Sequence, residues 1–189
     1  AWEPGQFGGQ VIAEILYGKV NPSAKLAMTM PRSVGQIQTI YNHHPSAFFH
    51  PVVCGTSEPL YPFGFGLSYT TYKYSNLTLD KTAMAKDGSV KASVTITNTG
   101  SRDGVEIAQL YIHDVVASAE RPVKELKDFR RVALKAGESK TVDFTITPDK
   151  LAFYDKDMHY GVEPGDFDVM IGGSSKDADE LKATFTVEN

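Results

Sequence analysis

The sequence has only one cysteine, and it lacks the long apolar runs that mark membrane proteins. Cys54 has no partner within the chain, so an internal disulfide is excluded. No apolar run approaches the roughly 20 residues of a membrane-spanning helix, and the first residues have neither the basic start nor the apolar core of a signal peptide. We therefore expect no membrane partner. The compartment stays open, with a periplasmic or secreted location preferred to a cytoplasmic one.

Positive charge is also scarce. The formal net charge is -4, and no dense run of lysine and arginine is present. Because binding to phosphates needs a basic patch, we expect no nucleic-acid partner. Apolar residues make up 41% and charged residues 22% of the 189 residues, which is typical of one large or two small globular domains.

Motifs for cofactors, metals and nucleophilic catalysis are missing as well. The sequence has no Walker loop, no dinucleotide fingerprint and no Gly-x-Ser-x-Gly elbow, so we predict no cofactor. His43, His44, His50 and Cys54 lie close together in the sequence, but their spacing fits no standard zinc pattern. We therefore predict no metal site and interpret these residues as polar side chains of a loop.

A pair of catalytic carboxylates is equally absent. Hydrolysis by two carboxylates requires that both face the same bond of the substrate. Glu3, Glu14 and Glu58 are the only acidic residues in the first 60 positions, and nothing in their spacing pairs them. We predict no catalytic residue in this chain.

Residues 1–57 favour α/β structure. A helical stripe is formed by Gly8, Val11, Ile12, Ile15 and Leu16. The segment KLAMTMP, from Lys25 to Pro31, is typical of a short strand that a proline ends. One helix and one strand cannot build a two-layer core. We therefore interpret residues 1–57 as the C-terminal tail of an incomplete α/β-sandwich domain.

Residues 72–189 show the strict alternation of half-buried strands. The seven predicted strands lie in residues 72–79, 89–98, 104–114, 124–134, 140–147, 166–173 and 181–188. A phase shift near Ile107 and Ala108 suggests a β-bulge. The chain is thus predicted to be mainly β, with a seven-stranded immunoglobulin/fibronectin type III-like β-sandwich after the tail.

Residues 58–71, in the stretch EPLYPFGFGLSYTT, join these two parts and have two interpretations. Aromatic rings beside glycines are typical of a loop that stacks on a sugar, but they also suit a packed joint between domains. We predict an inter-domain linker in which most rings are buried and the glycines permit tight turns. The joint residues are Tyr61, Phe63, Gly64, Phe65, Gly66 and Tyr69.

Read together, these motifs resemble family 3 glycoside hydrolases, the β-glucosidases and related β-xylosidases. The first 37 residues are similar to the end of their α/β-sandwich domain, with Trp-x-Pro-Gly, a Gly-Gly helix start, Asn-Pro-Ser before Lys-Leu, and Thr-x-Pro-Arg. Ala24 and Gln38 depart from the usual Gly and Pro. The blocks YNHHPS and PLYPFGFGLSYTTY follow in family order. RPVKELKDFRRVALKAGESKTVDFTIT and GDFDVMIGGSS resemble the C-terminal fibronectin type III-like domain.

The resemblance implies a C-terminal, non-catalytic portion of a retaining exo-β-glycosidase. The family's nucleophile and acid/base lie in an N-terminal barrel and in earlier parts of the α/β-sandwich, which would be the partners of this chain. The parent would act on a β-glucoside-type substrate. Loop placement in the family implies a substrate-cleft border at Trp2, Tyr41, His43 and His44. The alternative is a stand-alone β-sandwich module that binds carbohydrate or protein.

Overall fold

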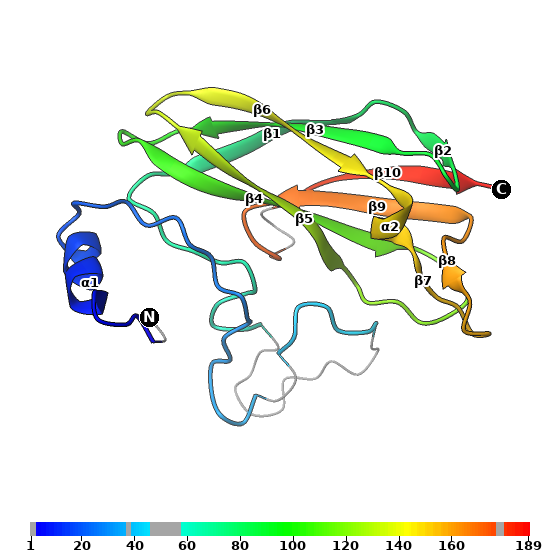
Figure 1. Cartoon of the computed structure of the whole chain (residues 1–189), viewed down its shortest axis with the longest axis horizontal. Coiled ribbons are helices and arrows are strands. Elements are labelled where there is room, and N and C mark those ends of the chain that lie inside the picture. The colour runs from blue at the N-terminus through cyan, green and yellow to red at the C-terminus, as the bar shows by residue number, and fades with distance from the viewer. Residues whose placement is uncertain (1–2, 37–38, 46–57, 177–179) are drawn as a thin grey trace.

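The computed structural model describes residues 3–36, 39–45, 58–176 and 180–189. It contains an N-terminal tail, which we define as the described residues up to 71, and a β-sandwich from residue 72 onward (Figure 1). In the tail, the helix α1 spans Gly8–Leu16. The sandwich contains β1 (Tyr72–Leu79), β2 (Ala83–Ala85), β3 (Val90–Asn98), β4 (Gly104–Asp114), β5 (Glu125–Leu134), β6 (Ser139–Ile146), α2 (Pro148–Leu151), β7 (Phe153–Tyr154), β8 (Tyr160–Gly161), β9 (Gly165–Gly172) and β10 (Leu181–Glu188).

The long strands form two sheets that face each other. One sheet has three strands in the order β1-β3-β6, and the other has five in the order β2-β10-β9-β4-β5. Neighbouring long strands are antiparallel, and the short β2 runs parallel to β10. This is the two-layer β-sandwich expected from the sequence. All seven predicted strands are present, together with the short strands β2, β7 and β8.

Alternating apolar residues of both sheets fill the space between them. The fully buried members include Val94, Ile96, Leu110, Phe144, Ile171 and Phe185. The apolar positions of β3 and β6 are buried, except for the partly buried Val142, and the intervening ones are mostly less so, as a half-buried strand requires. The predicted bulge lies slightly further along β4 than expected, because the register against β5 shifts between Leu110 and Tyr111. The sandwich therefore has a core of its own.

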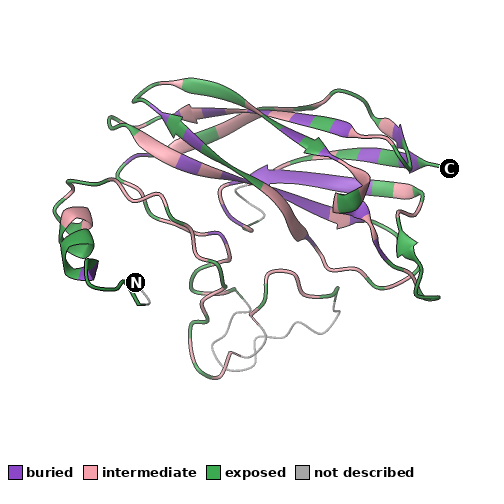
Figure 2. Ribbon diagram, in the orientation of Figure 1, coloured by how far each residue is buried: buried purple, intermediate pink, exposed green. Residues whose placement is uncertain are grey.

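The tail covers the outer face of the five-stranded sheet, the face turned away from the other sheet (Figure 1). Strand β9 shows the consequence, because six consecutive residues from its third position onward are buried (Figure 2). Strand β4 likewise buries five consecutive residues from Ala108 to Ile112. A strand is buried on both sides only when both faces are covered. The core covers one face here, and the tail covers the other.

The strand predicted between Lys25 and Pro31 is not formed, and that prediction is wrong. The segment makes only an isolated bridge between Met30 and Tyr61. Hydrogen bonds from Leu26 N–H to the Phe65 carbonyl (2.8 Å) and from Met30 N–H to the Tyr61 carbonyl (2.8 Å) hold it beside residues 60–65. Pro62 has no N–H to donate, so a continuous ladder cannot form there.

The predicted helix is present, but most of its apolar side is exposed. Val11, Ile12 and Leu16 of α1 are all exposed (Figure 2). Gly8 is the buried residue of the helix, where it lies against Pro4. Among the described residues, no helix combines the length and the apolar character needed to cross a membrane.

Candidate functional site

Gly64 is a point of close contact between the tail and the sandwich. Its backbone has a φ of 77°, which L side chains rarely adopt, and a β-carbon added there would lie 2.1 Å from Oε1 of Gln109. The side-chain amide of Gln109 donates hydrogen bonds to the carbonyls of Gly64 (3.2 Å) and Gly173 (2.7 Å). Tyr111 in turn donates its hydroxyl hydrogen to Oε1 of Gln109. The glycine therefore permits a hydrogen-bonded contact that any side chain would block.

An aromatic column lies beside this contact. The rings of Phe63 and Tyr41 stack with centroids 4.1 Å apart and an interplanar angle of 17°. Tyr41 then meets the edge of Tyr111 on β4 at 5.9 Å. The hydroxyl of Tyr41 also accepts a hydrogen bond from the backbone N–H of Leu126 (3.2 Å). Tyr41 and Phe63, two of the predicted site residues from separate segments of the tail, are thus brought together on the sheet.

None of the four rings of the joint is fully buried within this chain, and their burial against a neighbouring domain stays a prediction. Tyr61 and Tyr69 are 41% and 42% exposed, and Phe63 and Phe65 are half-buried. Tyr61 and Phe65 stack on each other at 4.9 Å and 22°. Phe63 likewise stacks on a tail residue, Tyr41, and Tyr41 in turn contacts Tyr111 of the sandwich.

Asn21 fixes a second point of the tail. Its Oδ1 accepts hydrogen bonds from the hydroxyl of Ser68 (2.9 Å) and the N–H of Tyr69 (2.9 Å), and its Nδ2 donates to the carbonyl of Asp103 (3.0 Å). The hydroxyl of Tyr69 reaches the carbonyl of Ile15 at the end of α1 (2.6 Å). Asn21 therefore ties the linker to the loop before β4, and Tyr69 ties the linker to the end of the helix.

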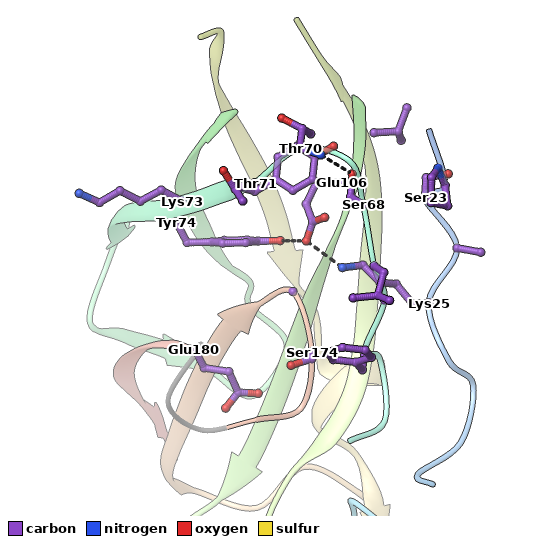
Figure 3. Close-up of a pocket in the computed structure, with 18 of the residues that line it drawn as sticks. Ser23, Lys25, Ser68, Thr70, Thr71, Lys73, Tyr74, Glu106, Ser174 and Glu180 are labelled. Carbon is purple, nitrogen blue, oxygen red and sulfur yellow. Dashed lines mark hydrogen bonds and ion pairs between the residues drawn. The ribbon is translucent and has the colours of Figure 1, made fainter. Parts of the chain in front are cut away.

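A pocket of about 600 Å³ lies between the tail, the start of β1 and β4 (Figure 3). Lys25 reaches into it from the tail, and Tyr74 reaches into it from β1. Both contact Oε1 of Glu106 on β4, at 3.1 Å from the ammonium and 2.8 Å from the hydroxyl. The Lys25 and Glu106 side chains are only 17% and 6% exposed. The pocket floor is therefore a desolvated ion pair that joins the two parts of the molecule.

This floor is suited to holding segments together rather than to proton transfer. Burial raises the pKa of Tyr74 well above its ordinary value, and the charge of Glu106 adds to the rise, so the phenol remains a hydrogen-bond donor. Lys25 neutralises the carboxylate. The other carboxylate that lines the pocket, Glu180, is ion-paired with Lys124, and both side chains are almost fully buried. Neither carboxylate is placed as a free acid or base.

Two of the four predicted cleft-border residues line a second, larger pocket of about 1010 Å³. Tyr41 and His43 line it, together with Arg32 and with His113 and Asp168 on the outer face of the sheet. The other two predicted residues differ. His44 lies beside Glu120, with 3.7 Å between Nδ1 and Oε2, and Trp2 lies outside the described residues.

No grouping of metal ligands is found in the part of the chain that the structure describes. No three histidine, cysteine, aspartate or glutamate side chains there lie close enough to hold an ion. His50 and Cys54 lie outside the described residues, so the structure says nothing of them.

Sequence reasoning missed the polar anchors of the seam between tail and sandwich. Lys25 and Glu106 are 81 residues apart, and Asn21 and Asp103 are 82 apart. Gln109 is a signal of such an anchor in the sequence, because it is a polar residue within the apolar run IAQLYI of β4. A buried polar side chain in such a run needs a hydrogen-bonding partner, and here the partner is the tail.

Two family models match the chain. The model of the glycosyl hydrolase family 3 C-terminal domain matches residues 1–69, and that of the fibronectin type III-like domain matches residues 106–175. The chain is 46% identical over 184 residues to a periplasmic beta-glucosidase of Salmonella typhimurium, and the alignment covers 92% of this chain and 24% of that protein. It is 43% identical over 188 residues to a beta-xylosidase of Formosa agariphila, covering 96% of the chain and 25% of that protein.

Solved structures of beta-glucosidases are also similar to this chain. A beta-glucosidase involved in saponin metabolism from intestinal bacteria superposes with a TM-score of 0.92 at 44% identity, covering 98% of this chain and 25% of that one. The beta-glucosidase from Listeria innocua in complex with glucose superposes with a TM-score of 0.89 at 38% identity, covering 100% of this chain and 27% of that one. The chain thus spans about a quarter of the length of the proteins it matches.

Proposed function

Because the chain belongs to family 3 of the glycosyl hydrolases and corresponds to their C-terminal region, we propose that it is the non-catalytic C-terminal portion of a retaining exo-β-glycosidase of the β-glucosidase type. In this role the β-sandwich braces the end of the α/β-sandwich domain and holds the loops around the active site. The observation that carries the proposal is the seam, where Gly64–Gln109, Lys25–Glu106 and Asn21 fasten the tail to the sandwich.

The partners we propose are the N-terminal barrel and the earlier part of the α/β-sandwich domain of the same enzyme. The exposed apolar side of α1 supports this assignment. Val11, Ile12 and Leu16 form an apolar stripe of the kind that a helix packs against a sheet. The exposed Tyr61–Phe65 stack supports it as well. A β-glucoside-type substrate would then reach the chain only through the parent enzyme, at the border formed by Tyr41, His43, His44 and Trp2.

The proposal is tested in the full-length enzyme by Gln109→Leu, which removes the hydrogen bonds to Gly64 and Gly173 and the acceptor of the Tyr111 hydroxyl. Gln109 is not itself one of the proposed cleft-border residues. We expect activity to be lost at a temperature lower by several degrees, on the order of 5 °C, while kcat measured well below that temperature stays within about twofold of the parent. Thr141→Val, at an exposed position of β6, is the matched control. A large loss of kcat without a change in unfolding temperature would contradict a bracing role.

A second candidate function is a carbohydrate-binding module. The near-coplanar, partly exposed Tyr61–Phe65 pair favours it, because flat exposed rings can stack on sugars. Calorimetry of the isolated chain with short β-glucans tests this candidate. Heat of binding that disappears in Tyr61→Ala would support it, and the absence of binding heat would leave the bracing role alone.

A further inference from the structure

Residues 115–124 connect β4 to β5, and side-chain contacts hold this strap against one end of the sandwich. The N–H of Ser118 donates to Oε2 of Glu163 (2.9 Å), and its hydroxyl donates to Oε1 of the same carboxylate. The guanidinium of Arg121 lies 4.6 Å from the ring centroid of Phe153. Ser118 and Arg121 therefore fasten the strap to the β7–β8 region of the sandwich.

The second half of the strap contacts the tail. The N–H of Val123 donates a hydrogen bond to the carbonyl of His43 (2.9 Å). Oε2 of Glu120 lies 3.7 Å from Nδ1 of His44, a contact that is an ion pair only when the imidazole is protonated. The strap thus links the sandwich to the segment that carries two of the predicted cleft-border residues.

Asp114, the last residue of β4, lies beneath the strap, and its carboxylate lacks part of the hydrogen bonding that a buried charge needs. It is only 9% exposed, and its buried Oδ2 has no hydrogen-bonding partner among the described residues. The groups that face it are the cation of Arg121, the carboxylate of Glu163, the imidazole of His113 and the N–H of Val116. Burial raises the pKa of Asp114 above its ordinary value. The Arg121 charge opposes that rise and the Glu163 charge adds to it.

We propose that the strap is a pH-sensitive latch, closed by acid and loosened as the pH rises, with Asp114 as its sensor. A neutral Asp114 is compatible with a closed strap because it brings no second negative charge next to Glu163. An ionised Asp114 needs a donor for Oδ2, and opening the strap supplies water as that donor.

The direction of this pH dependence follows from the linkage between proton binding and closure of the strap. A carboxyl group whose pKa is raised in the closed state binds its proton more tightly there than in the open state. The stabilisation of the closed strap is then fully present below the ordinary aspartate pKa and is lost as the pH rises through the raised value. A consequence for the cleft border at His43 and His44 rests on the proposed function, whereas the latch itself does not.

Hydrogen exchange measured by mass spectrometry on the full-length protein tests the latch without any assay of glycosidase activity. Exchange in peptides covering residues 115–124 is followed from about pH 4 to about pH 8 and divided by the intrinsic rate at each pH. We expect protection of the strap to fall by roughly threefold or more across this range, as expected for one linked proton with a modest pKa difference. Peptides from β6 serve as the internal reference.

Three variants decide the assignment. Asp114→Asn keeps the shape but cannot ionise, so its strap should stay protected at all pH values, while Asp149→Asn, an exposed control, should behave as the parent. Ser118→Ala removes the hydroxyl bond to Glu163 and should lower protection of the strap even in acid. A strap whose protection does not change with pH, or an Asp114→Asn protein that shows the same fall as the parent, would overturn the proposal.

Discussion

The side-chain amide of Gln109 occupies the space that a β-carbon on Gly64 would need, with 2.1 Å between the built β-carbon and Oε1. This contact closes the seam at a point where the tail backbone is left-handed. A single methyl group added at Gly64 therefore tests directly how closely the tail fits the sandwich.

Gly64→Ala should therefore destabilise the chain by about 2–4 kcal/mol, the sum of the left-handed backbone strain and the clash with Gln109. Gly137→Ala is the matched control, because Gly137 has nearly the same φ (76°) and no atom within 4 Å of an added β-carbon. It should cost only about 1 kcal/mol. Urea unfolding of both variants measures the difference, and equal costs would mean that the Gln109 contact is not formed.

Lys25→Met should destabilise by about 3 kcal/mol, because it leaves the Glu106 carboxylate buried without its cation. The double variant Lys25→Met/Glu106→Gln should cost clearly less than the sum of the two single changes, since it removes the uncompensated charge. Lys91→Met, which removes a half-exposed partner of Asp143 at 3.7 Å, should cost below about 0.5 kcal/mol. Additive single effects in the cycle would show that the buried pair does not couple the tail to the sandwich.

Asp128 should make the sandwich less stable in acid. Burial alone would raise its pKa, but hydrogen bonds and charges from Lys150 and Arg130 outweigh it and hold the pKa below the ordinary value. The stabilisation is present above the unfolded aspartate pKa and is lost as the pH falls through the lower folded value. Asp128→Asn should thus lose about 2 kcal/mol near pH 7 and little near pH 3, by urea unfolding at both pH values. A cost that is the same at both would refute this assignment.

The repeating elements of the fold were accessible from the sequence, but the seam was only partly so. Period-two alternation predicted most of the long strands, because one face of each lies on the core, and it was weakest for β4 and β5. The same rule failed for Lys25 to Pro31, where a hydrogen-bonding partner, not a side-chain pattern, decides whether a strand forms. Gly64 and Gly66 were predicted as joint residues from local backbone chemistry alone.

Long-range polar contacts were out of reach for a physical reason. The ion pair of Lys25 with Glu106 depends on how the tail lies across the sheet, and no local propensity encodes that placement. Tyr61 and Phe65 stack on each other within the tail, and their burial by a neighbouring domain stays a prediction. Composition cannot tell a ring that packs on a neighbour from one that packs on another domain.

The central claim, that this chain supports catalysis without performing it, is tested most directly by assaying the purified chain and the full-length enzyme side by side on an aryl β-glucoside. The account predicts turnover by the full-length enzyme and none above background by the chain, although circular dichroism should show the chain folded as a β-sandwich. Turnover by the chain that persisted through purification and vanished in a Glu106→Gln variant would contradict the account.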